Sequence, residues 1–99
     1  MRIRILSLAV EDLDAGRRFY EKQQEGLGEY FLDSLFSDID SLLLYAGIHQ
    51  KMFDYFRALS NRSPYAIYYR VEDTEIQVWR VLDCRQAPNR TTQALTDIG

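Results

Sequence analysis

The sequence has 99 residues, of which 46% are hydrophobic and 27% charged, and its net charge is −3. This length allows one domain with a single core, and no apolar run approaches the ~20 residues that a membrane helix needs. One cysteine (Cys84) and one histidine (His49) exclude an internal disulfide framework and a multi-histidine or cysteine-rich metal site. We therefore expect a cytoplasmic protein with no metal or other cofactor, and the short apolar N-terminus does not predict a signal peptide.

The charge is unevenly distributed along the chain. Residues 1–49 carry five Lys/Arg and nine Asp/Glu, whereas residues 50–99 carry seven Lys/Arg, six of them arginine, and six Asp/Glu. Nucleic-acid-binding proteins usually have a basic excess, because phosphate neutralisation supplies most of their affinity. Since the whole chain lacks that excess, contact with nucleic acid would depend on a local arginine cluster in the second half.

The first half predicts one strand and two helices. Residues 2–8 alternate partly and include β-branched residues, which predicts a short strand. Residues 10–24 predict an amphipathic helix. Gly26 and Gly28 interrupt this helix. Apolar residues then recur at spacings of three and four over residues 28–46, which predicts a longer helix that buries Leu32, Leu35, Phe36, Ile39 and Leu43 on a sheet. The short glycine link predicts a helical hairpin.

The second half changes to the period of strands. Strands are predicted at residues 52–59, 65–71 and 75–83, separated by a turn cluster at 60–64 and a hairpin loop at 72–74. The order β-α-α-β-β-β predicts an α+β fold, in which the helical hairpin packs on one face of a small antiparallel sheet. We expect a single domain over residues 1–88. Residues 89–99 have no periodicity and predict an irregular tail that is loose or folds on a partner.

The alternation of the last two strands assigns side chains to two faces. Pairing Val71 with Ile76 puts one apolar set under the helices: Tyr65, Ile67, Tyr69, Ile76, Val78 and Leu82. Arg80 falls on the same face, which implies either a place near the rim of the sheet or a register shifted by one residue. Tyr, Trp and Arg anchor protein interfaces, so the opposite, solvent-facing side predicts a partner-binding surface of Tyr68, Arg70, Gln77 and Trp79.

The chain contains none of the common catalytic motifs: no Gly-rich phosphate loop, GxSxG, HExxH or CxxC. Arg57, Arg62 and Arg85 are chemically suggestive, because guanidinium groups can clamp a phosphate and stabilise charge that develops on it. The alternative, favoured by nearby acids, is ordinary surface ion pairing worth about 0–1 kcal/mol per pair. His49 follows the second helix, where an isolated histidine predicts a surface position.

Three stretches together resemble one family. The first runs from Arg62 to Val71 and contains R-x-P-Y-x-I-x-Y, the second runs from Ile76 to Pro88 and ends V-L-D-x-R-x-x-P, and the third links the helices from Tyr20 to Phe31. Their order resembles the RelE/ParE superfamily of bacterial toxins from type II toxin–antitoxin modules, over residues 1–88. The resemblance implies a helical hairpin on a small antiparallel sheet and a cognate antitoxin, whose C-terminal segment wraps the sheet and hairpin.

The resembled superfamily has two activities. RelE-like members cut messenger RNA on the ribosome, using strand Lys/Arg and a C-terminal Tyr or His, whereas ParE-like members poison DNA gyrase. Here Lys51 is the only lysine of the sheet half, and no Tyr or His follows Trp79, so the expected acid–base group is missing. The resemblance thus implies a ParE-like gyrase inhibitor that is neutralised by its antitoxin and forms a homodimer or a toxin–antitoxin hetero-oligomer.

Two alternatives stay open. The first is a RelE-like, ribosome-dependent mRNA endoribonuclease, which would use Arg57, Arg62 and Arg85 as its catalytic candidates. The second is a degenerate member of the superfamily that still binds an antitoxin but is no longer toxic.

Overall fold

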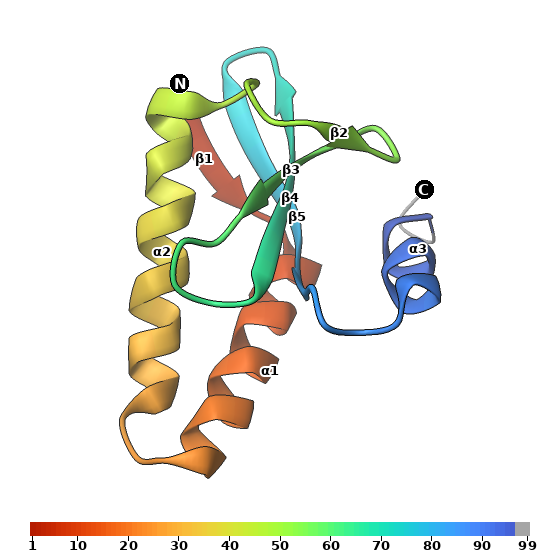
Figure 1. Ribbon diagram of the computed structural model, residues 1–99. Coiled ribbons are helices and arrows are strands. Elements are labelled where there is room, and N and C mark those ends of the chain that lie inside the picture. The colour runs from red at the N-terminus through yellow and green to blue at the C-terminus, as the bar shows by residue number, and fades with distance from the viewer. Residues whose placement is uncertain (97–99) are drawn as a thin grey trace.

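The computed structural model describes residues 1–96 and has helices on both sides of one sheet. Figure 1 shows α1 and α2 side by side against one face, with α3 on the other side. The elements are β1 (Arg2–Ile5), α1 (Ser7–Gln23), α2 (Leu27–Tyr45), β2 (Lys51–Met52), β3 (Tyr55–Leu59), β4 (Tyr65–Glu72), β5 (Glu75–Asp83) and α3 (Pro88–Thr96). In the part of the chain that the structure describes, no helix is long and apolar enough to span a membrane.

The five strands follow the order β1-β5-β4-β3-β2. The predicted α+β fold, with the helical hairpin on one face, is confirmed. The sheet is mixed, however, because β1 pairs in parallel with β5, whereas the other neighbours are antiparallel. The first strand is also shorter than predicted, since α1 already begins at Ser7.

The turn of the helical hairpin is held by one carboxylate. Glu21 accepts hydrogen bonds from the backbone N–H groups of Gly26 (3.1 and 3.2 Å) and Gly28 (2.9 Å). These bonds, that of Gly26 first, lower the pKa of Glu21. Gly26 has a left-handed φ of 90°, which glycine adopts without steric cost. At Gly28 a Cβ would lie 2.7 Å from the carbonyl oxygen of Arg17, so the two helices approach closely there.

Helix α2 is continuous, as predicted, but its buried face is narrower than its apolar stripe. Leu35 and Ile39 are buried and Leu32 is partly buried, whereas Phe36 and Leu43 are 42% and 52% exposed. The expectation of burial is therefore wrong for Phe36 and Leu43. The sheet and α1 meet only a stripe at spacings of four and three, formed by Phe31, Leu35, Ile39 and Leu42.

A β-bulge interrupts the pairing of β4 with β5. Tyr69 pairs with Val78 but Tyr68 pairs with Arg80, which leaves Trp79 as the extra residue of β5. Because side chains alternate with period two, one extra residue exchanges the two faces for the rest of the strand.

The bulge corrects the predicted inward face. Val81 packs in the core under the helices, and Leu82 packs on the opposite side, so the prediction is wrong for Leu82. The bulge also explains the position of Arg80. Its side chain is not part of the core and forms a hydrogen bond with Asp12 on α1. The prediction is confirmed for the three residues of β4 and for the two residues of β5 that precede the bulge: Tyr65, Ile67, Tyr69, Ile76 and Val78.

The predicted strand over residues 52–59 is a hairpin. Strand β2 ends at Met52, β3 begins at Tyr55, and these two residues pair. The two residues between them, Phe53 and Asp54, both have positive φ (53° and 66°). Such values suit a two-residue turn between twisted strands. The sequence did not indicate this turn, because it lacks the glycine or asparagine that is typical there.

The expectation of an irregular tail is wrong for residues 89–96, which belong to α3; residues 97–99 lie outside the described residues. Pro88 is the first helical residue, a position where its missing N–H costs nothing. Leu95 of α3 is buried on the sheet face opposite α1 and α2, where it completes a small second cluster with Tyr55, Ala66, Tyr68 and Leu82. We call the main core, between the sheet and α1 and α2, the helix-side cluster.

Candidate protein-interaction surface

The four residues predicted to bind a partner share one face of the sheet, and their role in binding stays a prediction. Together with Tyr55 they form what we call the aromatic–arginine surface: Tyr55, Tyr68, Arg70, Gln77 and Trp79. Contacts between these side chains join β3, β4 and β5 on the side away from α1 and α2. Tyr55 joins the set because β3 aligns it beside β4, which the alternation of residues 52–59 alone does not show.

The guanidinium group of Arg70 stacks on two aromatic rings. Its Cζ atom lies 4.3 Å from the ring centroid of Tyr55 and 5.1 Å from that of Trp79. The two rings meet edge to face, with their centroids 6.0 Å apart. Such stacking stabilises the cation and fixes its position, so Arg70 is held in place while its hydrogen-bonding groups stay without a carboxylate among residues 1–96.

Trp79 is oriented by a chain of hydrogen bonds along β5. Its Nε1–H donates to Oε1 of Gln77 at 3.3 Å, and Nε2 of Gln77 donates to Glu75 at 2.9 Å. Glu75 also pairs with Arg2 and Arg4 of β1. The hydrogen bond from Gln77, followed by the charges of the two arginines, lowers the pKa of Glu75. This chain of contacts connects the indole ring to the edge of the sheet.

The solvent exposure predicted for Tyr68 is wrong, because α3 covers it. Tyr68 is 2% exposed and its hydroxyl accepts a hydrogen bond from Nε of Arg57 at 3.1 Å. Tyr55 is 1% exposed, and its hydroxyl has no hydrogen-bond partner among the described residues. Gln77 and Trp79 are partly buried. The surface is thus partly covered by the chain itself.

The arginines proposed as a phosphate clamp differ in their partners. Arg57 reaches Tyr68 and the Sγ of Cys84 (3.5 Å) on the α3 side, and the bond to Tyr68 raises the pKa of Arg57. Arg85 instead pairs with Asp83 at 2.8 Å and contacts the hydroxyl of Tyr20, a residue of α1.

The ion pair between Arg85 and Asp83 affects the pKa of the carboxyl group. The Arg85 side chain lowers the pKa of Asp83, as the ion-pair alternative expects. Arg62 is exposed in the turn between β3 and β4. The bond of Arg85 to Tyr20 directs it toward the helices, whereas the bond of Arg57 to Tyr68 holds it on the α3 side of the sheet.

A hollow that the sequence did not indicate lies around Arg57. It has a volume of about 440 Å³ and is lined by His49, Lys51 and Arg57 together with Gln50, Met52 and Leu59. His49 is half-buried: its Nδ1 shares a hydrogen bond with the hydroxyl of Tyr69, which also accepts the backbone N–H of Gly47 at 3.0 Å. The β2–β3 turn gathers these side chains, and that turn had no signal in the sequence.

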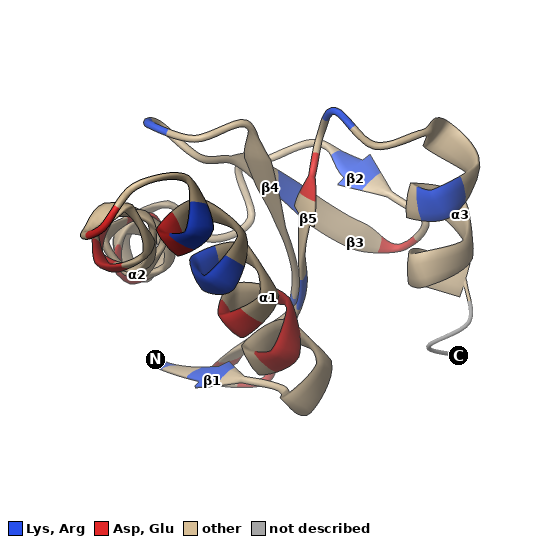
Figure 2. Ribbon diagram, turned by 90° about the horizontal axis from the view of Figure 1, so that it is seen from below, with Lys and Arg blue, Asp and Glu red and all other residues tan. Residues whose placement is uncertain are grey.

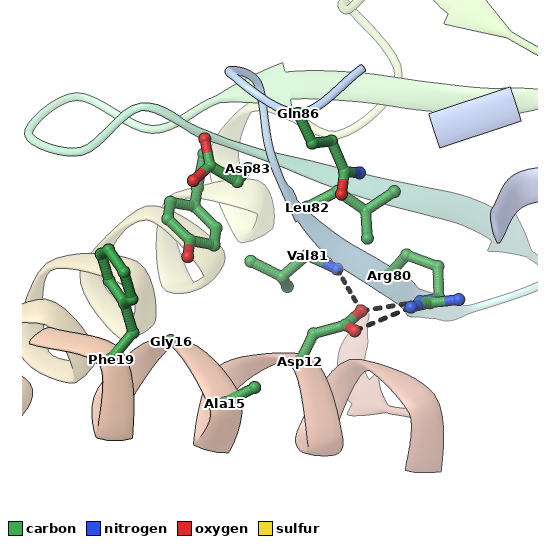
Figure 3. Close-up of a pocket in the computed structure, with 10 residues that line it drawn as sticks. Asp12, Ala15, Gly16, Phe19, Arg80, Val81, Leu82, Asp83 and Gln86 are labelled. Carbon is green, nitrogen blue, oxygen red and sulfur yellow. Dashed lines mark hydrogen bonds and ion pairs between the residues drawn. The ribbon is translucent and has the colours of Figure 1, made fainter. Parts of the chain in front are cut away.

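A second hollow, of about 290 Å³, lies between α1 and the end of β5 (Figure 3). Asp12 accepts hydrogen bonds from Nε and Nη2 of Arg80 (2.7 and 2.8 Å) and from the backbone N–H of Val81 (3.0 Å). This pairing raises the pKa of Arg80, and burial raises the pKa of the neighbouring Tyr65 to about 12. Asp12 thereby occupies a backbone donor of β5 beyond the end of β1 and links α1 to β5. The residues of this hollow therefore serve to hold the fold together.

Within residues 1–96, no group of three or more His, Cys, Asp or Glu side chains is arranged to hold a metal ion. The arrangement that the structure does present is a set of aromatic and cationic side chains suited to contact with another macromolecule.

Comparisons with known proteins place the chain in one family. Residues 3–88 match the model described as the ParE toxin of the type II toxin–antitoxin system parDE. A solved structure titled "Chromosomal ParDE TA system from P. aeruginosa" is similar, with a TM-score of 0.74 and 20% identity over 82% of this chain and 92% of that chain. No curated protein matches the sequence. The solved structure shows a shared fold, and the family model shows that the chain belongs to the ParE toxin family of type II toxin–antitoxin systems.

Proposed function

We propose that the chain is a toxin that inhibits DNA gyrase in the bacterial cytoplasm and is neutralised by a cognate antitoxin. The observation that carries this proposal is the match of residues 3–88 to the ParE toxin model. The ParDE system named for the similar structure supports an antitoxin partner. The different partners of Arg57 and Arg85 favour this activity over phosphate cleavage by Arg57, Arg62 and Arg85.

The antitoxin is proposed to contact the aromatic–arginine surface. Trp, Tyr and Arg dominate the energetics of protein interfaces, and Arg70 is held rigidly by Tyr55 and Trp79. Neither Arg57 nor Arg70 has an acidic partner among residues 1–96. An acidic segment of the antitoxin would complement these two cations.

A gyrase supercoiling assay tests the proposed target. The purified chain should inhibit supercoiling of relaxed plasmid, and addition of its cognate antitoxin should restore it. Supercoiling that continues at a large molar excess of the chain would contradict gyrase inhibition.

The antitoxin surface has its own variant. Trp79→Ala should weaken antitoxin affinity by ~2 kcal/mol, or about 30-fold, because it removes an aromatic anchor. Thr74→Ala is a matched control, since Thr74 lies exposed in the β4–β5 turn, and it should leave the affinity unchanged. Equal affinities of the two variants would remove Trp79 from the interface.

The hollow around Arg57 supports a second candidate, a ribosome-dependent mRNA endoribonuclease. His49 can transfer a proton, and Lys51 and Arg57 can stabilise charge on a phosphate in the same hollow. In this candidate, the three residues would take the place of the missing C-terminal Tyr or His. Cleavage of ribosome-bound messenger RNA that is lost in His49→Ala and retained in Arg85→Ala would favour this candidate.

The same experiments distinguish a third alternative, a non-toxic member of the family, from the two toxic activities. A chain that binds the antitoxin but affects neither gyrase nor ribosome-bound messenger RNA would be a degenerate, non-toxic member of the family.

A further inference from the structure

We propose that a groove on the outer side of the helical hairpin binds a basic segment of DNA gyrase. This inference rests on the proposed function, because gyrase is the proposed target. It concerns a different surface from the one proposed for the antitoxin, since the aromatic–arginine surface lies on the side of the sheet away from α1 and α2. The toxin would then contact its target and its antitoxin through separate surfaces.

The groove lies between α1, α2 and the end of β1, and its walls are mostly apolar. Its volume is about 190 Å³, comparable with cavities of ~150 Å³ that accept a benzene ring. We call it the hairpin groove and define it by its apolar residues, Ile5, Val10, Leu13, Leu32 and Phe36. Asp14 and Arg17 also line it, but they pair with each other at 2.9 Å. The hairpin groove therefore suits one aliphatic or aromatic side chain of a partner.

An exposed apolar stripe of α2 continues the hairpin groove. Phe36 and Leu43 are both exposed, and a spacing of seven residues places them two turns apart on one side of the helix. Val10 of α1 is exposed in the same hollow as Phe36. The apolar periodicity of α2 includes Phe36 and Leu43, but the helix-side cluster uses neither. Adjoining exposed apolar side chains, unlike scattered ones, mark interaction sites.

The α2 rim of the hairpin groove is acidic. Helix α2 carries four carboxylates and no lysine or arginine, and Figure 2 shows the acidic segments on it. Three of the four are exposed and lie seven, three and four residues from Phe36: Glu29, Asp33 and Asp40. Residues at these spacings are neighbours on a helix surface. None of the three has a basic partner among residues 1–96, so their charges are available to a basic partner.

The acidic rim selects among the possible occupants. The antitoxin segment proposed for the aromatic–arginine surface is acidic, and like charges at an interface are costly. A twofold dimer through the hairpin groove would bring the same acidic rim of two copies together. An enzyme that binds DNA has basic surfaces, because phosphate neutralisation supplies much of the affinity. A gyrase segment with an apolar anchor flanked by Lys or Arg therefore fits both the walls and the rim.

The first test compares two exposed aromatic residues of α2 in the full-length chain. Phe36→Ala removes an apolar wall of the hairpin groove, and Tyr30→Ala changes a ring six residues earlier, about a third of a turn away around the helix. Circular dichroism first shows the fold of each variant. Half-inhibition of gyrase supercoiling should need about tenfold more Phe36→Ala than parent chain, because an aromatic anchor is lost. Affinity for the cognate antitoxin, measured by calorimetry, should be unchanged, and Tyr30→Ala should match the parent chain in both assays.

The acidic rim has a separate test, at exposed positions that do not depend on the fold of Phe36→Ala. Asp33→Asn combined with Asp40→Asn should raise the half-inhibitory concentration about threefold at low salt and less at high salt, because salt screens exposed charges. Glu25→Gln combined with Asp73→Asn is the matched control. It removes the same net charge from two exposed turn positions and should inhibit as strongly as the parent chain.

The proposal is overturned if both Phe36→Ala and the Asp33/Asp40 variant inhibit gyrase as strongly as the parent chain. A proportional loss of antitoxin affinity in Phe36→Ala would assign the hairpin groove to the antitoxin and overturn it as well. So would a parent dimer that Phe36→Ala dissociates in analytical ultracentrifugation, because the occupant would then be a second copy. In each of these cases inhibition by the parent chain preserves the proposed function, whereas a parent chain that does not inhibit gyrase contradicts both.

Discussion

The two faces of the sheet differ in how completely their side chains are packed. The helix-side cluster joins apolar residues of α1, α2 and four strands, and one of its two buried tyrosines, Tyr69, has hydrogen bonds with Gly47 and His49. The second cluster is smaller, depends on Leu95 of α3, and contains the unpartnered hydroxyl of Tyr55. The helix-side face therefore contributes more to the stability of the fold, and we propose that the other face binds a partner.

The largest expected effect tests the helix-side face. Leu35 is fully buried, so Leu35→Ala should lower the free energy of unfolding by about 2–5 kcal/mol. Leu43→Ala, on the exposed side of the same helix, should lower it by less than ~1 kcal/mol. Denaturant titration measures both. Similar losses for the two variants would show that α2 does not bury one face selectively.

The next largest effect concerns the ion pair between Asp12 of α1 and Arg80 of β5. Asp12→Ala leaves Arg80 and the N–H of Val81 without their acceptor, which should cost about 2–3 kcal/mol of unfolding free energy. Asp14→Ala, which breaks only exposed pairs with Arg17 and Arg18, should cost less than ~1 kcal/mol. Equal costs would mean that the bulge does not depend on this ion pair.

A pair of tyrosine variants sharpens the comparison within the second cluster. Tyr68→Phe removes a hydroxyl that bonds to Arg57 and should cost about 1 kcal/mol. Tyr55→Phe removes an unpartnered hydroxyl and should raise stability by up to about 1 kcal/mol. Thermal unfolding monitored by circular dichroism shows whether each variant is less or more stable than the parent chain. A loss of stability in Tyr55→Phe would show that its hydroxyl has a partner.

The smallest effect is a pH dependence of the helical hairpin. The bonds from Gly26 and Gly28 hold the pKa of Glu21 below its ordinary value of 4.5. A carboxylate with a lowered pKa stabilises the fold above its unfolded pKa, and this contribution is lost as the pH falls through the folded value.

The measurement for Glu21 is a difference between two chains. The stability advantage of the parent chain over Glu21→Gln should be constant at neutral pH and should shrink as the pH falls below about 4.5. An advantage independent of pH would contradict the role of the carboxylate charge in the turn.

The elements with strong local patterns could be predicted from the sequence. The apolar stripe of α2, the glycines before it and the alternation of β4 and β5 are encoded within each segment, and the motifs around Arg62 and Asp83 indicated the family. The same alternation brought Tyr68, Arg70, Gln77 and Trp79 to one face.

The features that sequence reasoning missed depend on contacts between segments. The bulge at Trp79 is a property of the pairing of two strands, and it decides whether Val81 or Leu82 enters the helix-side cluster. Helix α3 has only Ala94 and Leu95 as apolar contacts, too few for a periodic signal. The hollow around His49 needs the turn at Phe53 and Asp54, and phenylalanine rarely adopts the positive φ that this turn requires.

The central claim, that the aromatic–arginine surface binds the antitoxin, can be measured at one residue. Trp79 is the only tryptophan of the chain, so its quenching by acrylamide reports on this surface when a tryptophan-free antitoxin is titrated in. The account predicts that quenching falls as the complex forms, because the antitoxin buries the indole ring. Complex formation with unchanged quenching of Trp79 would contradict the claim and place the antitoxin elsewhere.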